Sequence, residues 1–475
     1  MDYKWTALTV TTVGATMGGI DTRIAIIGLP TIASQLGVGA EEVVWITQSY
    51  LLAATVFLLL FGRTSDIFGR VKLYNAGFIV FTVGSALCAL SLNAYMLISF
   101  RILQGAGSSL LIANSAAIIT DATPKNELGT ALGINASGFR IGAMAGLTLS
   151  GLILSFVDWR GLFYVNVPIG IFGTLWARWK LREIGQKDTV MKMDWMGFAL
   201  FSAGLTLVLV ALTFLSYGLV SSMAEGLGSL FFGLLLISIF FIKESRTQSP
   251  ILDPKLFKIR AFAMGNIAEL FVGIAWAGAI LLVPLYLQLT IGYTPLESGL
   301  AVLPLEVSFL ISSLVSGRMS DRYDPRILST IGLAIIALGL GIVSTLSESP
   351  FYPEIGFALI LIGVGSGLFT MPLTRAIMAS VPTTRRGVAS AFTSTIFNMG
   401  FTASYGIVIL FITIGIPYSA LSTLLQNAQA FPLNSVLRGE FLVGFQITSL
   451  ILAIVVAATI LPASLIGGKD STGPR

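Results

Sequence analysis

The chain has 475 residues, of which 55% are hydrophobic and only 11% are charged, and its formal net charge is +5. Soluble domains have about 25% charged residues, so this chain has too few charges to cover a water-exposed surface, and we expect most of its surface to face lipid. It contains no histidine and a single cysteine, Cys88. It therefore lacks the residues for thiolate or imidazole metal sites, serine–histidine triads and internal disulfides. We predict no metal site, no cofactor and no enzymatic activity.

Fourteen segments are long and apolar enough to cross about 30 Å of hydrocarbon, which takes about 20 residues of helix. In chain order they are 6–30, 44–62, 71–92, 95–120, 128–155, 161–180, 194–216, 226–243, 261–289, 297–317, 327–346, 353–379, 387–416 and 441–465. Several contain glycine or proline, which spanning helices tolerate when neighbouring helices satisfy the freed backbone groups. The pattern predicts an all-α integral membrane protein with fourteen transmembrane helices.

The lysines and arginines indicate which loops face the cytoplasm, because cytoplasmic loops of membrane proteins are enriched in both residue types. With the N-terminus placed in the cytoplasm, only Arg160 and Arg438 of the basic residues outside the spans fall on the opposite side. This bias continues along the whole chain. We therefore predict a multi-pass protein of the cell membrane with both termini in the cytoplasm. The bias also explains the positive net charge without a nucleic-acid partner.

The longest cytoplasmic connections, 181–193 and 244–260, are rich in charge and bracket two plain apolar spans. We interpret these two spans as a pair inserted between two blocks of six. The predicted domains are an N-terminal six-helix bundle (1–185), the inserted pair (186–250) and a C-terminal six-helix bundle (251–475).

A short sequence recurs after the second span of each six-helix block. The first copy contains Gly62, Arg63, Asp66, Gly69 and Arg70, and the second contains Gly317, Arg318 and Asp321. Internal repeats indicate secondary transporters, whose halves alternate access to a site near the middle of the membrane. We interpret both copies as a cytoplasmic gate in which a carboxylate meets positive charge or a helix end. The alternative interpretation is a solvated turn.

Several stretches of the sequence are similar to one known family. They are 45–53 (WITQSYLLA), 62–70 (GRTSDIFGR), 101–105 (RILQG), 159–160 with 166–170 (WR and NVPIG), 284–288 (PLYLQ), 299–300 with 304, and 386–390 (RGVAS). Over nearly its whole length the chain resembles the fourteen-helix drug:proton antiporter branch of the major facilitator superfamily. The resemblance implies two six-helix bundles around a central cavity, and proton-driven export of hydrophobic, often cationic compounds.

The resemblance also implies roles for individual residues. In that family an aspartate lies nine residues before the proline of a Leu-Pro pair, which here gives Asp21, and the helix-four arginine matches Arg101. Both are implied in proton coupling. The family's helix-five antiporter motif ends Gly-Pro-x-x-Gly-Gly. The matching stretch here retains Gly146 and Gly151, preceded by Gly142, and lacks the proline.

Asp21 and Arg101 are predicted to lie at similar depth. At 1.5 Å per residue, Asp21 is about 22 Å from the cytoplasmic end of its span, and Arg101 is about 9 Å from the outer end of its span. In a core of about 30 Å both fall in the outer half. Ionisable residues within spans are functional candidates because their burial is costly. We therefore predict an Asp21–Arg101 couple that changes protonation during transport; the alternative is a static ion pair.

Seven further residues inside the spans are candidates to line the substrate cavity: Arg23, Arg140, Asn266, Glu269, Trp276, Gln288 and Glu306. Asn266, Glu269 and Trp276 share one helix face. Arg23 lies about 200° around the helix from Asp21, so we expect it either to pair between helices or to reach outward to the surface. Without histidine, the proton carrier is Asp21, Glu269 or Glu306. For each glutamate the alternative is a protonated carboxyl bonded to backbone.

The leading hypothesis is a proton-coupled secondary transporter that exports small amphipathic or drug-like compounds by alternating access. Its expected partners are a small-molecule substrate, protons and the lipid bilayer, and we expect a monomer. A second hypothesis, favoured by Arg23 and Arg140, is proton-coupled transport of an anionic or zwitterionic metabolite. A channel or a membrane enzyme is a remote third, since the sequence contains no filter-like ring and no catalytic cluster.

Overall fold

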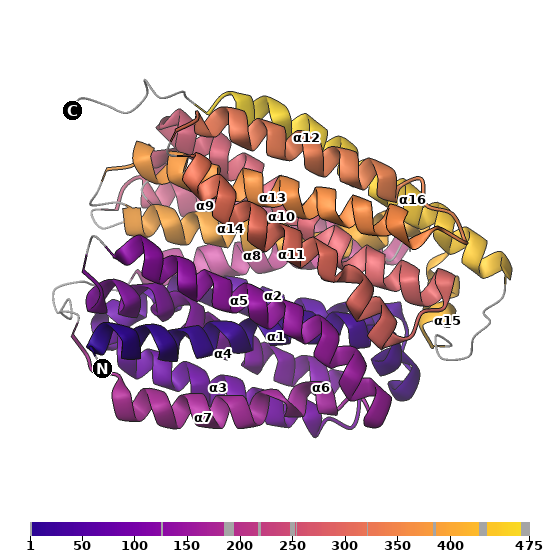
Figure 1. Ribbon diagram of the computed structural model, residues 1–475, viewed down its shortest axis with the longest axis horizontal. Coiled ribbons are helices and arrows are strands. Elements are labelled where there is room, and N and C mark those ends of the chain that lie inside the picture. Colours follow the sequence, from indigo (N-terminus) through magenta and orange to yellow (C-terminus); the bar gives the residue numbers. More distant parts are fainter. Residues whose placement is uncertain are drawn as a thin grey trace. The chain divides into compact units, whose positions relative to one another are not determined.

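The computed structural model describes residues 2–124, 127–184, 194–216, 220–247, 252, 254–320, 322–382, 386–426 and 435–466, and these residues form helices and connections without any β-strand (Figure 1). The helices are α1 (Tyr3–Leu36), α2 (Ala40–Phe68), α3 (Arg70–Ala89), α4 (Ala94–Ala122), α5 (Leu128–Phe156), α6 (Gly161–Tyr164), α7 (Asn166–Lys180), α8 (Trp195–Ser216), α9 (Val220–Glu244), η1 (Pro254–Lys258), α10 (Arg260–Tyr286), η2 (Leu287–Ile291), α11 (Pro295–Met319), α12 (Pro325–Val343), α13 (Tyr352–Ser380), α14 (Arg386–Gly415), α15 (Tyr418–Gln426) and α16 (Ser435–Ser464). The prediction of an all-α fold is confirmed.

Every predicted span falls on one of these helices or on a directly connected pair. Among the described residues, eleven helices are long and apolar enough to cross a membrane. The other three predicted spans correspond to α1, α2 and the α6–α7 pair. The chain is therefore an integral membrane protein, and its helices are compatible with the count of fourteen, which stays a prediction.

One predicted span, 161–180, is interrupted in the structure. The short helix α6 ends at Tyr164, Val165 forms a turn, and α7 begins at Asn166. Pro168 lies in the first turn of α7 and has no backbone N–H, so it cannot continue the helical hydrogen bonding back to α6. The interruption places Asn166 at the start of a helix, deep inside the protein, where it is fully buried.

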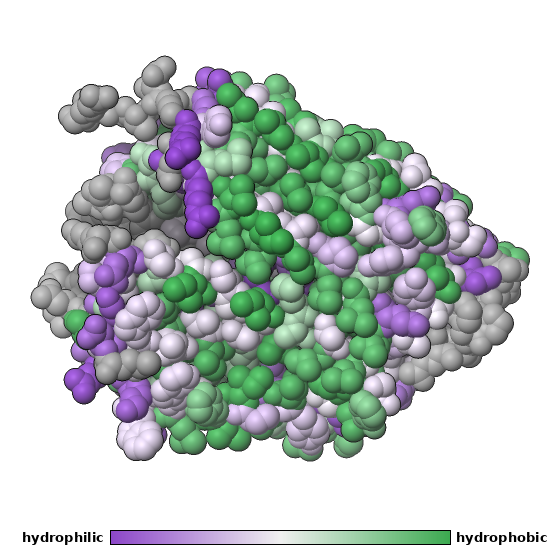
Figure 2. Space-filling model, viewed as in Figure 1, coloured by the Kyte–Doolittle hydropathy of each residue, from purple (hydrophilic) through white to green (hydrophobic). Residues whose placement is uncertain are grey.

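The exposed faces of the helices are strongly apolar, and Figure 2 shows hydrophobic side chains over much of the visible surface. In α9, for example, Phe231 and Phe232 are 64% and 58% exposed. Only 17% of the most apolar stretch of α9 is buried inside the protein, against 89% for α10. Apolar patches of this extent mark a surface that contacts lipid or another apolar partner, as expected for membrane helices, whereas α10 belongs to the protein core.

The chain divides into two compact units, the first built mainly from Met1–Met193 and the second mainly from Asp194–Gly292 and Ala301–Leu424. In the first unit α1 packs against α5, and α3 packs against α4 and α7. In the second unit α10 packs against α14, and α12 packs against α13 and α16. α8 packs against α9, and it also contacts α14. The assignment of 186–250 as a separate inserted domain stays a proposal.

The two units repeat the same helix crossings through glycine. A Cβ on Gly19 of α1 would lie 2.9 Å from the Ala143 backbone nitrogen of α5, and one on Gly273 of α10 would lie 2.7 Å from the Phe397 carbonyl of α14. Both distances are shorter than real Cβ contacts. The helices therefore touch backbone to backbone, and only glycine fits at these positions.

The α3–α4 and α12–α13 crossings repeat in the same way. Gly77 faces Leu111 in the first unit, and Gly332 faces Phe369 in the second, each across the equivalent helix pair. The α2–α4 crossing of the first unit also has an equivalent in the second unit, the α11–α13 crossing. In the first unit, Gly105 of α4 faces the Tyr50 carbonyl of α2. Its counterpart, Gly363, faces the Leu305 carbonyl. The internal repeat found after the second helix thus extends to the packing of at least three helix pairs.

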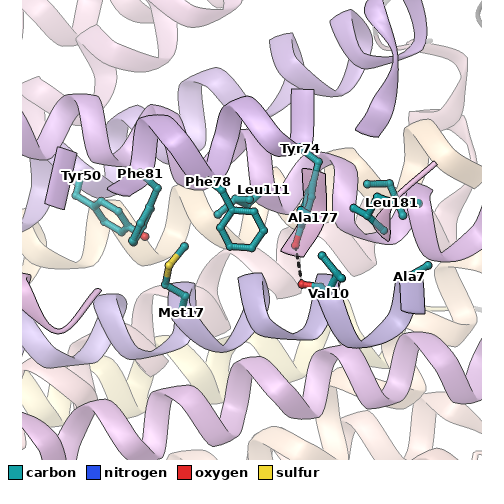
Figure 3. Close-up of a cluster of buried hydrophobic side chains, with 11 residues drawn as sticks. Ala7, Val10, Met17, Tyr50, Tyr74, Phe78, Phe81, Leu111, Ala177 and Leu181 are labelled. Carbon is teal, nitrogen blue, oxygen red and sulfur yellow. Dashed lines mark hydrogen bonds between the residues drawn. The ribbon is translucent and has the colours of Figure 1, made fainter. Parts of the chain in front are cut away.

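A buried aromatic cluster fixes α3 against its neighbours (Figure 3). Tyr74, Phe78 and Phe81 of α3 are fully buried, and they pack against Met17 of α1 and Leu111 of α4. The hydroxyl of Tyr74 reaches the backbone carbonyls of α1 at 3.4 Å. Burying large aromatic side chains stabilises a core strongly. This cluster holds α1, α3 and α4 in the register that the site requires.

Candidate functional site

The first unit encloses an ion pair between α1 and α4. Nη1 of Arg101 lies 2.8 Å from Oδ2 of Asp21. Both side chains are almost completely inaccessible, with 1% and 0% exposure. The two side chains that we expected to form a couple are thus in contact, and their depth in the membrane stays a prediction. Their role in proton coupling stays a proposal.

Gln104, one turn after Arg101 on α4, ties the ion pair to α3. Its Nε2 donates to Oδ1 of Asp21 and to Oγ of Ser85, both at 2.7 Å. Its Oε1 accepts from Nη1 of Arg101 at 2.7 Å, and the Cys88 thiol lies 3.8 Å from the same oxygen. Both ends of the amide are engaged, so the orientation of Gln104 is fixed.

Asn166 adds a third donor to Asp21. Its Nδ2 lies 2.9 Å from Oδ1 of Asp21, and the residue is fully buried at the start of α7. The carboxylate thus accepts from Arg101, Gln104 and Asn166 together. Several hydrogen bonds to one buried carboxylate offset the desolvation of its charge.

Arg101 has further partners that carry no charge. Its Nε donates to the Ile46 carbonyl at 3.2 Å. Its guanidinium lies over the Tyr50 ring, 4.1 Å from the centroid, and 5.6 Å from the centroid of Phe163. Cation–π contacts of this kind stabilise a desolvated guanidinium. Arg101 would therefore keep favourable contacts after a loss of charge at Asp21.

The other arginines predicted for the cavity have separate positions. Arg23 is only 2% exposed, so the alternative in which it reaches outward to the surface is wrong. Residues 23–33 of α1 are all buried, so the helix presents no face to the surface along this stretch. Arg140 is half-buried on α5, on a stretch where Gly138 lies against Thr12 of α1. The geometry does not bring Arg140 into the network around Asp21.

The second unit contains buried carboxyl groups at other positions. Glu269 and Asn266 of α10 are 6% and 4% exposed. Within the described residues, Oε2 of Glu269 and Oδ1 of Asn266 have no hydrogen-bond partner. On the same helix, Trp276 packs against Phe309 with ring centroids 5.2 Å apart and the two ring planes tilted by 54°. The predicted polar and aromatic face of this helix is therefore buried within the protein.

Two other predicted cavity residues are also buried. Glu306 of α11 is fully inaccessible, and Gln288 lies in the π-helical turn η2 with 6% exposure. π-helical turns are rare in proteins, and those that occur are often found at functional sites. Buried carboxyl and amide groups are retained in membrane helices at a cost, so both remain candidates for the substrate cavity.

The gate sequence is partly described. Gly69 has a φ of 107° and ends α2, so α3 follows at once. Nη1 of Arg70 then donates to both carboxylate oxygens of Asp121, at 2.7 and 2.8 Å. Glu183 accepts from the Arg70 and Val71 backbone at the N-terminus of α3, at 2.9 and 3.1 Å, where negative charge is favoured.

The two copies of the gate sequence share one local contact. Oγ of Ser65 donates to the Gly62 carbonyl at 2.6 Å, and Oγ of Ser320 donates to the Gly317 carbonyl at 2.7 Å. Arg318 is exposed. The side chains of Arg63 and Asp66, and the whole of Asp321, lie outside the described residues, and the gate stays a prediction.

The predicted helix-five motif lies at helix crossings. Gly142 faces the Thr16 carbonyl and Gly146 faces the Ile20 carbonyl, both on α1. Gly151 faces the backbone of Leu296. In the second unit Ser404 of α14 takes the place equivalent to Gly146, and its Oγ donates to the Ile274 carbonyl of α10 at 2.7 Å. The motif's glycines therefore determine how closely α5 packs.

A set of membrane-length helices, in two repeats that each bury charged residues, defines a multi-pass membrane transporter. The sequence matches the family model of the Major Facilitator Superfamily over residues 11–405. The chain belongs to the major facilitator superfamily.

Relatives over most of the chain are transporters. The riboflavin transporter RibZ of Clostridioides difficile is 30% identical over 84% of this chain and 86% of its own length. The multidrug transporter MdtP of Bacillus subtilis is 28% identical over 82% of this chain and 72% of its own length. The tetracenomycin C resistance and export protein of Streptomyces glaucescens is 27% identical over 83% and 73%. The chain is thus a transporter of small molecules and not an enzyme.

Solved structures share the fold. An inward-facing, occupied bacterial homologue of the human lysosomal transporter Spinster superimposes with a TM-score of 0.69 at 14% identity, covering 98% of this chain and 97% of that chain. The POT family transporter PepTSo superimposes with a TM-score of 0.66 at 14% identity, covering 98% of both chains. These likenesses confirm the predicted major facilitator fold.

Sequence reasoning missed Gln104 and Asn166 as partners of Asp21, and it missed Ser85 as a partner of Gln104. Gln104 and Asn166 both lie in stretches that carried the family resemblance, namely RILQG and NVPIG. The available signal was therefore the recurrence of an amide within each motif. Ser85 stood in no motif, and only the packing of α3 against α4 reveals it.

Proposed function

We propose that the chain is a proton-coupled secondary transporter that exports small amphipathic or drug-like compounds by alternating access. It acts as a monomer in the cell membrane with both termini in the cytoplasm. The observation that carries the proposal is the buried Asp21–Arg101 ion pair with its hydrogen-bonded surroundings. Ionisable residues inside membrane helices mark ion and proton pathways.

The network supports a change of charge at Asp21. An ionised Asp21 binds Arg101 and thereby links α1 to α4. A proton on Asp21 removes the electrostatic attraction, while Arg101 retains Ile46, Gln104 and the Tyr50 ring as partners. Protonation therefore weakens one link between two helices, while the guanidinium keeps neutral hydrogen-bond and cation–π partners. This is the property that a proton-driven conformational change requires.

The substrate cavity is proposed to include the face of α10 that carries Asn266 and Glu269. Their buried oxygens have no hydrogen-bond partner in the described parts of the chain, and such acceptors favour a ligand that brings a donor or a positive charge. The names of MdtP and of the tetracenomycin C exporter support amphipathic compounds as substrates.

The test is transport in proteoliposomes under an imposed pH gradient, with a lipophilic fluorescent cation as the first substrate. The wild-type protein is expected to move the compound in the direction opposite to proton flow. The Asp21→Asn variant is expected to show no such movement. Asp158→Asn is the matched control, because Asp158 pairs with Arg160 in an exposed position. Proton-driven transport by Asp21→Asn at the wild-type rate would refute the role of Asp21.

A second candidate is proton-coupled transport of an anionic or zwitterionic metabolite. The buried Arg23 and the half-buried Arg140 favour it, and the similarity to a riboflavin transporter adds a polar metabolite to the substrates worth testing. A thermal-shift screen with cationic, neutral and anionic ligands, riboflavin included, at two pH values separates the candidates. Stabilisation by anions that is lost in Arg140→Gln would favour the second candidate.

A further inference from the structure

One acceptor remains unused beside Asp21. Oδ1 of Asn166 is buried and has no hydrogen-bond partner among the residues that the structure describes. The Nδ2 of the same amide donates to Asp21 at 2.9 Å. Buried polar atoms are nearly always hydrogen-bonded, so an unused acceptor on a group that already touches Asp21 needs an explanation.

The two protonation states of Asp21 need different partners. An ionised carboxylate only accepts hydrogen bonds, whereas a protonated carboxyl also donates one. Arg101 offers Asp21 donors only. Gln104 cannot turn its oxygen toward Asp21 without turning its NH₂ group toward Arg101, because Oε1 of Gln104 accepts from Nη1 of Arg101 at 2.7 Å. The acid form of Asp21 therefore has no acceptor from these two residues.

Asn166 carries the missing acceptor. We propose that Asn166 is a positioning residue that binds Asp21 in both protonation states, by turning its side-chain amide through half a rotation. Nδ2 then faces the carboxylate, and Oδ1 faces the carboxylic acid. This inference rests on the proposed function, since it requires Asp21 to gain and lose a proton.

Local geometry favours the rotation. The terminal torsion of asparagine is broad and two-fold, so exchange of its oxygen and nitrogen needs no change in the backbone. Oδ1 has no partner in the described structure that a rotation would have to break. The consequence is mechanistic. α7 stays bound to α1 through Asn166 whether or not Asp21 holds a proton, while the link from α1 to α4 through Arg101 weakens on protonation.

The experiment is infrared difference spectroscopy of the purified full chain in lipid, between high and low pH. The carbonyl band of protonated Asp21 is assigned by its loss in Asp21→Asn. The variants compared are Asn166→Ala, which offers neither donor nor acceptor, and Asn166→Ser, whose hydroxyl offers both. Asn114→Ala is the matched control, because Asn114 is an equally buried asparagine of the same unit that donates to the Leu110 carbonyl.

The band of protonated Asp21 is expected to shift in Asn166→Ala, because its O–H group has lost its acceptor, and to return toward the wild-type position in Asn166→Ser. It is expected to stay in place in Asn114→Ala. A band at the wild-type position in Asn166→Ala would overturn the inference, and so would an equal shift in Asn114→Ala. If no band disappears in Asp21→Asn, then Asp21 does not titrate, and the proposed function fails before the role of Asn166 is in question.

Discussion

Replacing Arg101 by glutamine tests how far the protein depends on the buried ion pair. The change removes a guanidinium that is 1% exposed and leaves Asp21, which is fully buried, without its counter-charge. Breaking a buried pair by removing one partner costs about 3–5 kcal/mol, because the remaining charge is uncompensated. Gln104 and Asn166 still donate to Asp21. We therefore expect a loss near the lower limit, about 3 kcal/mol.

The assay is reversible denaturant unfolding of the detergent-solubilised protein at neutral pH, as a double-mutant cycle with Asp21→Asn. Residues in one ion-pair network couple by about 0.5–3 kcal/mol, so the double variant should be more stable than the sum of the single losses indicates. Arg160→Gln is the control, since its pair with Asp158 is exposed and contributes about 0–1 kcal/mol. Equal losses for Arg101→Gln and Arg160→Gln, with additive effects in the cycle, would refute the reasoning.

Two further predictions concern packing and pH. Gly142→Leu is expected to abolish the folded protein, because Gly142 lies against the Thr16 carbonyl, whereas Gly133→Leu on the same helix has open space around it and should fold; gel filtration of the two variants in detergent checks this. The hydrogen bond from Lys4 to Glu127 raises the pKa of Lys4 above its ordinary 10.5. The contact therefore stabilises the fold at pH values below 10.5. This contribution is lost as the pH rises through the raised pKa of Lys4. The melting temperatures of wild type and Lys4→Met should therefore differ at neutral pH and converge at pH values well above 10.5, and a constant difference would count against the contact.

The membrane helices could be predicted from sequence because lipid imposes a length and a polarity on each of them. The same constraint does not locate breaks within a span, so the interruption at Val165 was missed although Pro168 was visible in the sequence. The backbone contacts between equivalent glycines were missed for another reason. The sequences around Gly77 and Gly332 are dissimilar. Only the structure shows that each glycine lies where two helices cross in close contact.

The candidate site was predictable where charge was involved. A charge inside a helix is costly, and a rise of 1.5 Å per residue placed Asp21 and Arg101 at one depth. Neutral amides carry no comparable penalty, so Gln104 and Asn166 did not stand out. The direction of Arg23 depends on which neighbours enclose α1, and the sequence left two alternatives open. Burial of Arg23 excludes the alternative in which its side chain reaches outward to the surface.

The contact of α1 with α5 through Gly19 and Gly142 has a mechanical consequence. Flexible side chains between two helices can absorb small displacements, and at Gly19 and Gly142 the two backbones are in direct contact instead. Close-packed interiors transmit strain with little compression. A tilt of α1 that begins at Asp21 is therefore transmitted to α5 at these contacts, and we expect the two helices to move together.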